Sequence, residues 1–186
     1  MTTILPVPVI TILPDSSKGS TRVHRARPSG IDLIRRPLLC CALGFGAGLA
    51  PRAPGTVGTL VAIPIVILLA QGSNWLLPLV ALVFFAAGIY ICSDASKYYG
   101  SHDHSSIVWD EIVGYMIALS FVAVSLETIL IGFILFRLLD ILKPWPISWV
   151  DRNVPGAWGI MLDDVAAGLV ANAGLQLWLR QSWLVL

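Results

Sequence analysis

Long apolar runs separated by short polar loops fill most of this chain. Apolar runs of this length are typical of helices that lie in or cross a bilayer, where a crossing needs about 20 residues. The pattern predicts an all-α, multi-helical integral membrane protein with short or re-entrant helices. Its expected crossings cover residues 57–71, 75–93, 107–124, 128–142 and 160–180, and the first is the weakest because it is short and contains Pro64.

Two other segments precede these runs. Residues 1–36, rich in Thr, Ser, Pro and Arg, are expected to form a flexible basic cytoplasmic tail. This tail either contacts anionic headgroups or has no role beyond setting the orientation of the protein in the membrane. The segment PLLCCALGFGAGLA, residues 37–50, is too short to cross a bilayer and is expected to form a re-entrant or interfacial helix. We therefore expect one helical membrane domain over residues 37–186.

The amino-acid composition also indicates a membrane protein. The chain is 56% hydrophobic and 12% charged, whereas soluble domains carry about 25% charged residues. A net charge of +1 argues against nucleic acid as a partner. Of the three cysteines, Cys40 and Cys41 are adjacent and Cys92 stands apart, so a disulfide framework is not expected.

The charges are distributed unevenly along the chain. Six of the twelve basic residues precede Pro37, which favours a cytoplasmic amino end. With five crossings, the turns at 71–74 and 125–128 then lie outside and contain no Lys or Arg. Nearly all polar clusters fall on the cytoplasmic face, which predicts a polar site there.

Two acidic pairs stand at the edges of apolar runs. Asp110-Glu111 and Asp163-Asp164 are each expected to begin a helix, and neighbours on a helix point about 100° apart, so one acid of each pair can face a shared site. Carboxylates gathered at one depth repel one another unless a cation intervenes, and oxygen ligands suit Mg²⁺. The alternative is that the acids only stabilise the positive ends of two helices.

The stretch FRLLDILKPWP, residues 136–146, places Arg137 and Asp140 near one helix face. Asp140 is either a further metal ligand or a partner that holds Arg137. Arg137 and Lys143 are candidates for binding phosphate, and interfacial snorkelling is an equal alternative for Lys143.

Two loops add weaker signals. His102 and His104 could bind a transition metal or supply a general acid or base, although solvated side chains explain them equally well. Backbone amides in APGTVGT, residues 53–59, could meet a phosphate at a helix start. The chain contains neither a Gly-x-Ser-x-Gly elbow nor a Walker phosphate loop. Together these residues indicate phosphoester chemistry on an amphiphilic substrate.

Four motifs stand out along the chain: GFGAGLAPRAPGTVGTL (44–60), HDHSSIVWDEIVG (102–114), FRLLDILKPWPI (136–147) and DRNVPGAWGIMLDDVAAG (151–168). Together they resemble the phosphatidylglycerophosphatase A family, and the resemblance runs from about Leu39 to Leu179. It implies an all-helical, Mg²⁺-dependent phosphatase of the bacterial inner membrane, with its site facing the cytoplasm. The implied reaction converts phosphatidylglycerophosphate to phosphatidylglycerol and inorganic phosphate.

The resemblance also suggests roles for these residues. Arg137 and Lys143 would stabilise the developing charge, His104 or a carboxylate would protonate the leaving oxygen, and the nucleophile would be a water or an aspartate. The expected Mg²⁺ ligands are Asp110, Glu111, Asp140, Asp163 and Asp164, and the expected substrate-binding residues are Arg137, Lys143, Thr56 and Arg152.

Two other function classes remain at this stage. A divalent-cation transporter or channel predicts acids near mid-bilayer, which the apolar stretches 117–124 and 129–134 disfavour. The second alternative is a non-catalytic assembly protein, which would show no dependence on a metal.

Overall fold

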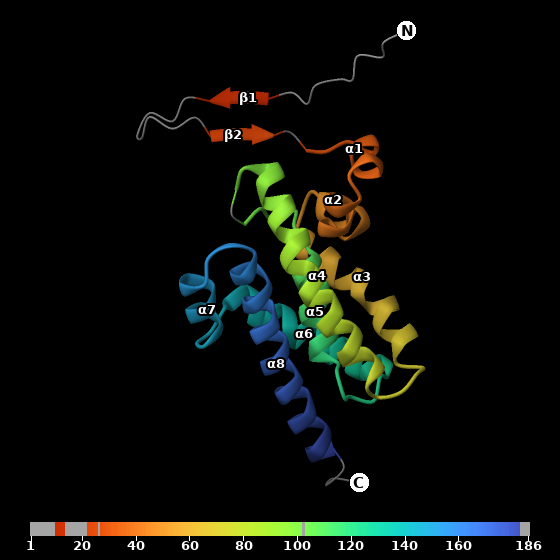
Figure 1. Cartoon of the computed structure of the whole chain (residues 1–186). Coiled ribbons are helices and arrows are strands. Elements are labelled where there is room, and N and C mark those ends of the chain that lie inside the picture. Colours follow the sequence, from red (N-terminus) through yellow and green to blue (C-terminus); the bar gives the residue numbers. More distant parts are fainter. Residues whose placement is uncertain (1–9, 14–21, 26, 102, 183–186) are drawn as a thin grey trace.

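The structure is a computed structural model that describes residues 10–13, 22–25, 27–101 and 103–182. From Gly30 to Ser182, every regular element in this part of the chain is helical (Figure 1). The elements are β1 (Ile10–Leu13), β2 (Arg22–Arg25), α1 (Gly30–Arg35), α2 (Pro37–Ala42), the 3₁₀ segment η1 (Gly44–Leu49), α3 (Pro54–Leu69), α4 (Leu76–Tyr99), α5 (Trp109–Ala118), α6 (Leu126–Leu142), α7 (Ile147–Asn153) and α8 (Gly156–Ser182).

The short helix α5 forms the centre of the helical domain. Most of its side chains are buried, and it packs against α3, α4 and α8. Its contact with α8 is close because two glycines face each other: a Cβ at Gly168 would lie 2.3 Å from the carbonyl oxygen of Gly114. This close approach brings the acidic residues of α8 next to those of α5.

The crossing expected over residues 107–124 is therefore wrong. At about 1.5 Å per residue, the ten residues of α5 span about 15 Å, half of the roughly 30 Å hydrocarbon layer. Its apolar side chains contact other helices, and burial in a protein core selects the same residues as burial in lipid. Asn172 of α8 donates to the carbonyl oxygens of Ala118 and Ser120, 3.0 and 2.7 Å away, where α5 ends.

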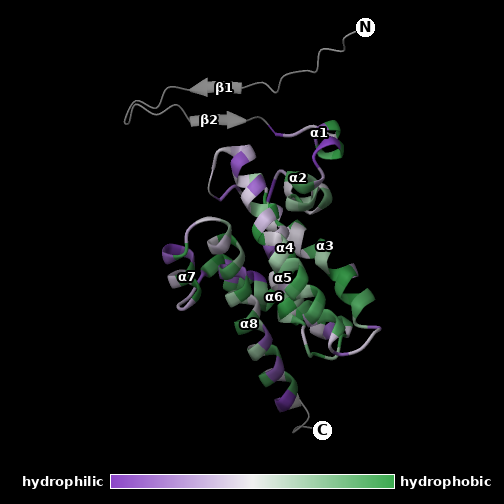
Figure 2. Ribbon diagram, viewed as in Figure 1, coloured by the Kyte–Doolittle hydropathy of each residue, from purple (hydrophilic) through white to green (hydrophobic). Residues whose placement is uncertain are grey.

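Two helices are long and apolar enough to cross a membrane, namely Leu76–Tyr99 and Gly156–Gln181. The helix α3 is apolar but shorter. Figure 2 shows hydrophobic residues dominating α3 and α4. Of the five expected crossings, two thus have helices of sufficient length and hydropathy in the described part of the chain.

Other segments differ from expectation in detail. Residues 37–50 form α2 and η1 rather than one helix, because Gly44, Phe45 and Gly46 all have positive φ, at 53°, 58° and 106°. The segment between the expected crossings 128–142 and 160–180 contains the short helix α7. Before the helical domain, β1 and β2 pair antiparallel, with Ile10 opposite Arg25. The flexibility expected of residues 1–36 stays a prediction.

Candidate active site

Helix ends and one loop enclose a polar pocket at one end of the bundle. It involves the first turns of α3 and α5, the last turns of α6 and the third turn of α8. Residues far apart in the sequence therefore share one site. The lining residues are Ala53, Pro54, Gly55, Asp103, Ser105, Ile107, Asp110, Glu111, Arg137, Asp140, Lys143, Ile160, Asp163 and Asp164.

Three carboxylates converge in this pocket. Asp110, Glu111 and Asp164 each offer an oxygen, and these oxygens all lie within 4.8 Å of one another. Buried carboxylate oxygens of all three residues have no hydrogen-bond partner in the described structure. Such a group is costly unless a cation balances it. An all-oxygen set of this kind suits a hard divalent cation such as Mg²⁺.

The protonation of the α5 carboxylates reflects this crowding. Burial raises the pKa of Glu111 to about 8, and the nearby charge of Asp164 acts in the same direction. Burial and the Glu111 charge also raise the pKa of Asp110 well above its ordinary value. Protons and a cation therefore compete for the same oxygens.

The two acidic pairs reach the pocket differently. Asp110 and Glu111 lie in the first turn of α5, as predicted. Asp163 and Asp164 do not begin a helix, because α8 already starts at Gly156, two turns earlier. The favourable effect of the helix dipole is confined to the first turn, so it does not explain the second pair. All four acids line the pocket, rather than one of each pair.

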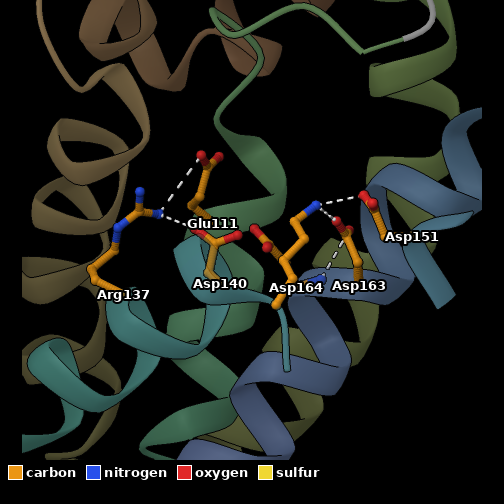
Figure 3. A network of polar contacts seen from close by, with 7 residues as sticks. Glu111, Arg137, Asp140, Asp151, Asp163 and Asp164 are labelled. Atoms are coloured by element: carbon orange, nitrogen blue, oxygen red, sulfur yellow. Dashed lines mark hydrogen bonds and ion pairs between the residues drawn. The ribbon is translucent and has the colours of Figure 1, made fainter. Parts of the chain in front are cut away.

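Arg137 is held at one side of the acidic group (Figure 3). Its Nη1 donates to Oδ2 of Asp140 over 2.6 Å and lies 3.8 Å from Oε1 of Glu111. The side chain of Arg137 is only 12% exposed. Of the two roles considered for Asp140, this contact favours that of a partner for Arg137, and Asp140 is outside the group of three converging carboxylates.

Lys143 occupies the other side of the pocket. It terminates α6 in the left-handed region, with φ of 42°. Its Nζ donates to Oδ1 of Asp151 on α7 and to Oδ2 of Asp163 on α8, each at 2.5 Å. Burial lowers the pKa of Lys143, but the two carboxylates outweigh this effect and raise it overall. The ammonium is therefore held at the pocket rather than extended towards an interface.

The amino end of α3 lies against Glu111 and Arg137. A Cβ at Gly55 would lie 2.1 Å from Oε1 of Glu111 and 3.1 Å from Nη2 of Arg137. No side chain caps this helix. First-turn amides have no partner within their own helix, so α3 brings backbone donors to the pocket beside Arg137.

Other predicted residues lie outside the pocket lining. His104 stacks on Tyr99 with ring centroids 3.8 Å apart, and its Nδ1 accepts from the backbone N–H of Ser106. Thr56 is half-buried in the first turn of α3, and Arg152 is exposed on α7. His102 lies outside the described residues.

Sequence reasoning assigned no contact within the site to three residues that the structure places there, although Gly55 belongs to the segment 53–59 whose amides were considered for phosphate. Asp103 lines the pocket, Asp151 binds Lys143, and Gly55 contacts Glu111. All three fall within or beside the motifs quoted above. Their spacing along the chain, however, carries no sign of these contacts, because each depends on another element.

Comparison with known proteins agrees with the motifs. The family model for Phosphatidylglycerophosphatase A matches residues 40–179. Phosphatidylglycerophosphatase A of Escherichia coli (strain K12) is 44% identical over 151 residues, which cover 81% of this chain and 87% of the relative. The protein of the same name from Haemophilus influenzae is 42% identical over 141 residues, or 74% and 86%. No solved structure matches. On this basis the chain belongs to the phosphatidylglycerophosphatase A family.

Proposed function

We propose that this protein hydrolyses the phosphate monoester of phosphatidylglycerophosphate, yielding phosphatidylglycerol and inorganic phosphate. Family membership supports this reaction. The structural observation that carries it is the convergence of Asp110, Glu111 and Asp164, beside the cations of Arg137 and Lys143. Carboxylates that bind a metal next to phosphate-binding cations are what phosphoryl transfer requires.

The cofactor in this proposal is Mg²⁺, held by Asp110, Glu111 and Asp164. Their unpartnered oxygens supply the donors that this ion prefers. When bound, it would neutralise phosphate charge and lower the pKa of a water. Asp140 and Asp163, predicted as further ligands, are paired with Arg137 and Lys143, and these contacts support positioning roles for them.

The phosphate in this proposal lies between α3 and Arg137. First-turn amides of α3 donate to its oxygens, since helix amino ends bind anions, and the Arg137 guanidinium donates from the side. Lys143 adds a second positive charge across the pocket. A water attacks phosphorus as the bond to the glycerol oxygen breaks, and that oxygen takes up a proton. Because His104 lies outside the lining, a pocket carboxylate is the better proton donor.

The location proposed for this protein is the bacterial inner membrane, as a multi-pass protein with its site facing the cytoplasm. The length and hydropathy of α4 and α8 support membrane insertion. The basic amino end supports the orientation. The cation-transporter alternative finds no support in the family match. It also requires acids along a path through the bilayer, whereas these acids gather in one pocket.

The decisive assay is phosphate release from phosphatidylglycerophosphate by the full chain in detergent micelles. We expect release that requires Mg²⁺ and stops on chelation. Asp164→Asn should lower the rate at least ~100-fold, because it removes one ligand charge. Glu127→Gln is the matched control, since Glu127 is exposed at the opposite end of α6. Undiminished activity of Asp164→Asn, or release that persists without any divalent ion, would contradict the metal assignment.

A further inference from the structure

One face of α6 combines exposed apolar side chains with Arg137. Leu130, Ile134, Arg137 and Ile141 are spaced at i, i+4, i+7 and i+11, which places them on one helical face. The three apolar members are 52%, 56% and 65% exposed, respectively. Arg137 is largely buried, because its side chain bends into the pocket to reach Asp140.

The spacing along this face suits a phospholipid whose phosphate lies at Arg137 and whose acyl chain lies along the apolar side chains. At about 1.5 Å per residue, Leu130 lies about 10 Å from Arg137 along the helix axis. Leu130 and Ile134 thus lead along α6 to the guanidinium proposed to bind phosphate, and Ile141 lies one turn beyond it. Beyond the last turn, Trp145 is 80% exposed, and exposed tryptophans are typical of the headgroup level of a bilayer.

We propose that this face of α6 binds an acyl chain of the substrate while the substrate's phosphate reaches Arg137. The inference rests on the proposed function and adds the path of the hydrocarbon tail. The occupant is the substrate lipid rather than bulk bilayer, because Arg137 lies within the same face and bonds to a pocket residue. By contrast, Leu79 and Leu82 of α4 are equally exposed, but the pocket has no lining residue from α4.

The direct test uses phosphatidylglycerophosphate with a photoreactive diazirine in one acyl chain. The probe is cross-linked to the full protein in mixed micelles, and the labelled peptides are mapped by mass spectrometry. We expect labelling within residues 130–141 that unlabelled phosphatidylglycerophosphate suppresses and an equal amount of phosphatidylcholine does not. Equal, uncompeted labelling of α4 and α6 would mean bulk lipid, and cross-links between two copies through α6 would mean a protein interface. Either result overturns the proposal.

Kinetics supply a second test. The double variant Leu130→Ala/Ile134→Ala should raise KM for the long-chain lipid by ~5- to 20-fold, as expected for lost apolar contacts, with kcat within about twofold. Leu79→Ala/Leu82→Ala is the matched control and should leave KM unchanged. On a water-soluble dihexanoyl substrate, the double variant should match the native protein. Equal KM changes in both double variants would refute the α6 path, whereas absent Mg²⁺-dependent release from either substrate would refute the proposed function itself.

Discussion

Replacing Gly55 by alanine tests the packing of α3 against the site. The added Cβ would lie 2.1 Å from Oε1 of Glu111. An ordinary contact needs about 3.4 Å, so the carboxylate must move by about 1.3 Å. Arg137 Nη2, at 3.1 Å from the same Cβ, restricts the direction of that movement. A displacement of about 1 Å at a catalytic group can cost about 100-fold in rate.

We therefore expect Gly55→Ala to lower kcat/KM about 100-fold and to weaken Mg²⁺ activation. The fold should persist. Gly55 is a helical residue without a positive φ, and alanine favours a helix over glycine by about 1 kcal/mol, which offsets part of an overpacking cost of about 1–3 kcal/mol. Net destabilisation should stay below about 2 kcal/mol, so activity and stability separate.

The assay is phosphate release across a Mg²⁺ titration, with thermal unfolding of the same samples in detergent. Gly174→Ala is the control, because a Cβ there would meet only Leu135 Cδ1, at an ordinary 3.7 Å. It should retain activity within about twofold. Full activity of Gly55→Ala with an unchanged Mg²⁺ requirement would show that the approach of α3 does not constrain Glu111.

Three further perturbations probe the same site. Asp140→Asn should raise KM about 10-fold by weakening the contact that holds Arg137, and an unchanged KM would show that Arg137 needs no such partner. In EDTA, the free energy of unfolding should fall as the pH rises from about 4.5 to about 8, because folded Glu111 keeps a proton that the unfolded chain has already lost. Mg²⁺ should flatten this slope in thermal unfolding, and equal slopes with and without the ion would argue against a ligand role. Gly168→Ala should destabilise the protein by about 3 kcal/mol, since its Cβ would meet the Gly114 carbonyl at 2.3 Å; an unaltered melting temperature would contradict the close helix contact.

Helices with a clear apolar run and a clear start were predictable from sequence. The expected run at 128–142 became α6, which begins at Leu126 after a capping box formed by Ser125 and Thr128. The crossing predicted from the run at 107–124 was wrong, because the apolar side chains of α5 contact protein rather than lipid. Hydrophobicity alone does not separate these two environments, and only the packing of other helices around α5 does so.

Five of the six acids that line the pocket were also predictable, because ionisable residues beside apolar runs are candidates for a functional site, and Asp103 was not. The pairing of Lys143 with Asp151 was not predictable, since Asp151 lies on α7, a helix that was not expected from the sequence. His104 shows the converse: its residue type suits proton transfer, whereas in the structure it stacks on Tyr99 and is not among the residues that line the pocket. Residue type indicates the available chemistry, and the fold decides which groups take part.

The charge of the pocket implies an order of binding. Among the described residues, its lining contains six carboxylates and two cations, Arg137 and Lys143, which gives a formal charge of −4 when all are ionised. A phosphate dianion would be repelled from such a pocket, and both cations already have carboxylate partners. Divalent cations or protons must therefore lower this charge before the substrate phosphate can enter. Inorganic phosphate should accordingly bind to the protein in calorimetry with Mg²⁺ present and not in EDTA at pH 8, and equal binding under both conditions would show that Arg137 and Lys143 suffice without the metal.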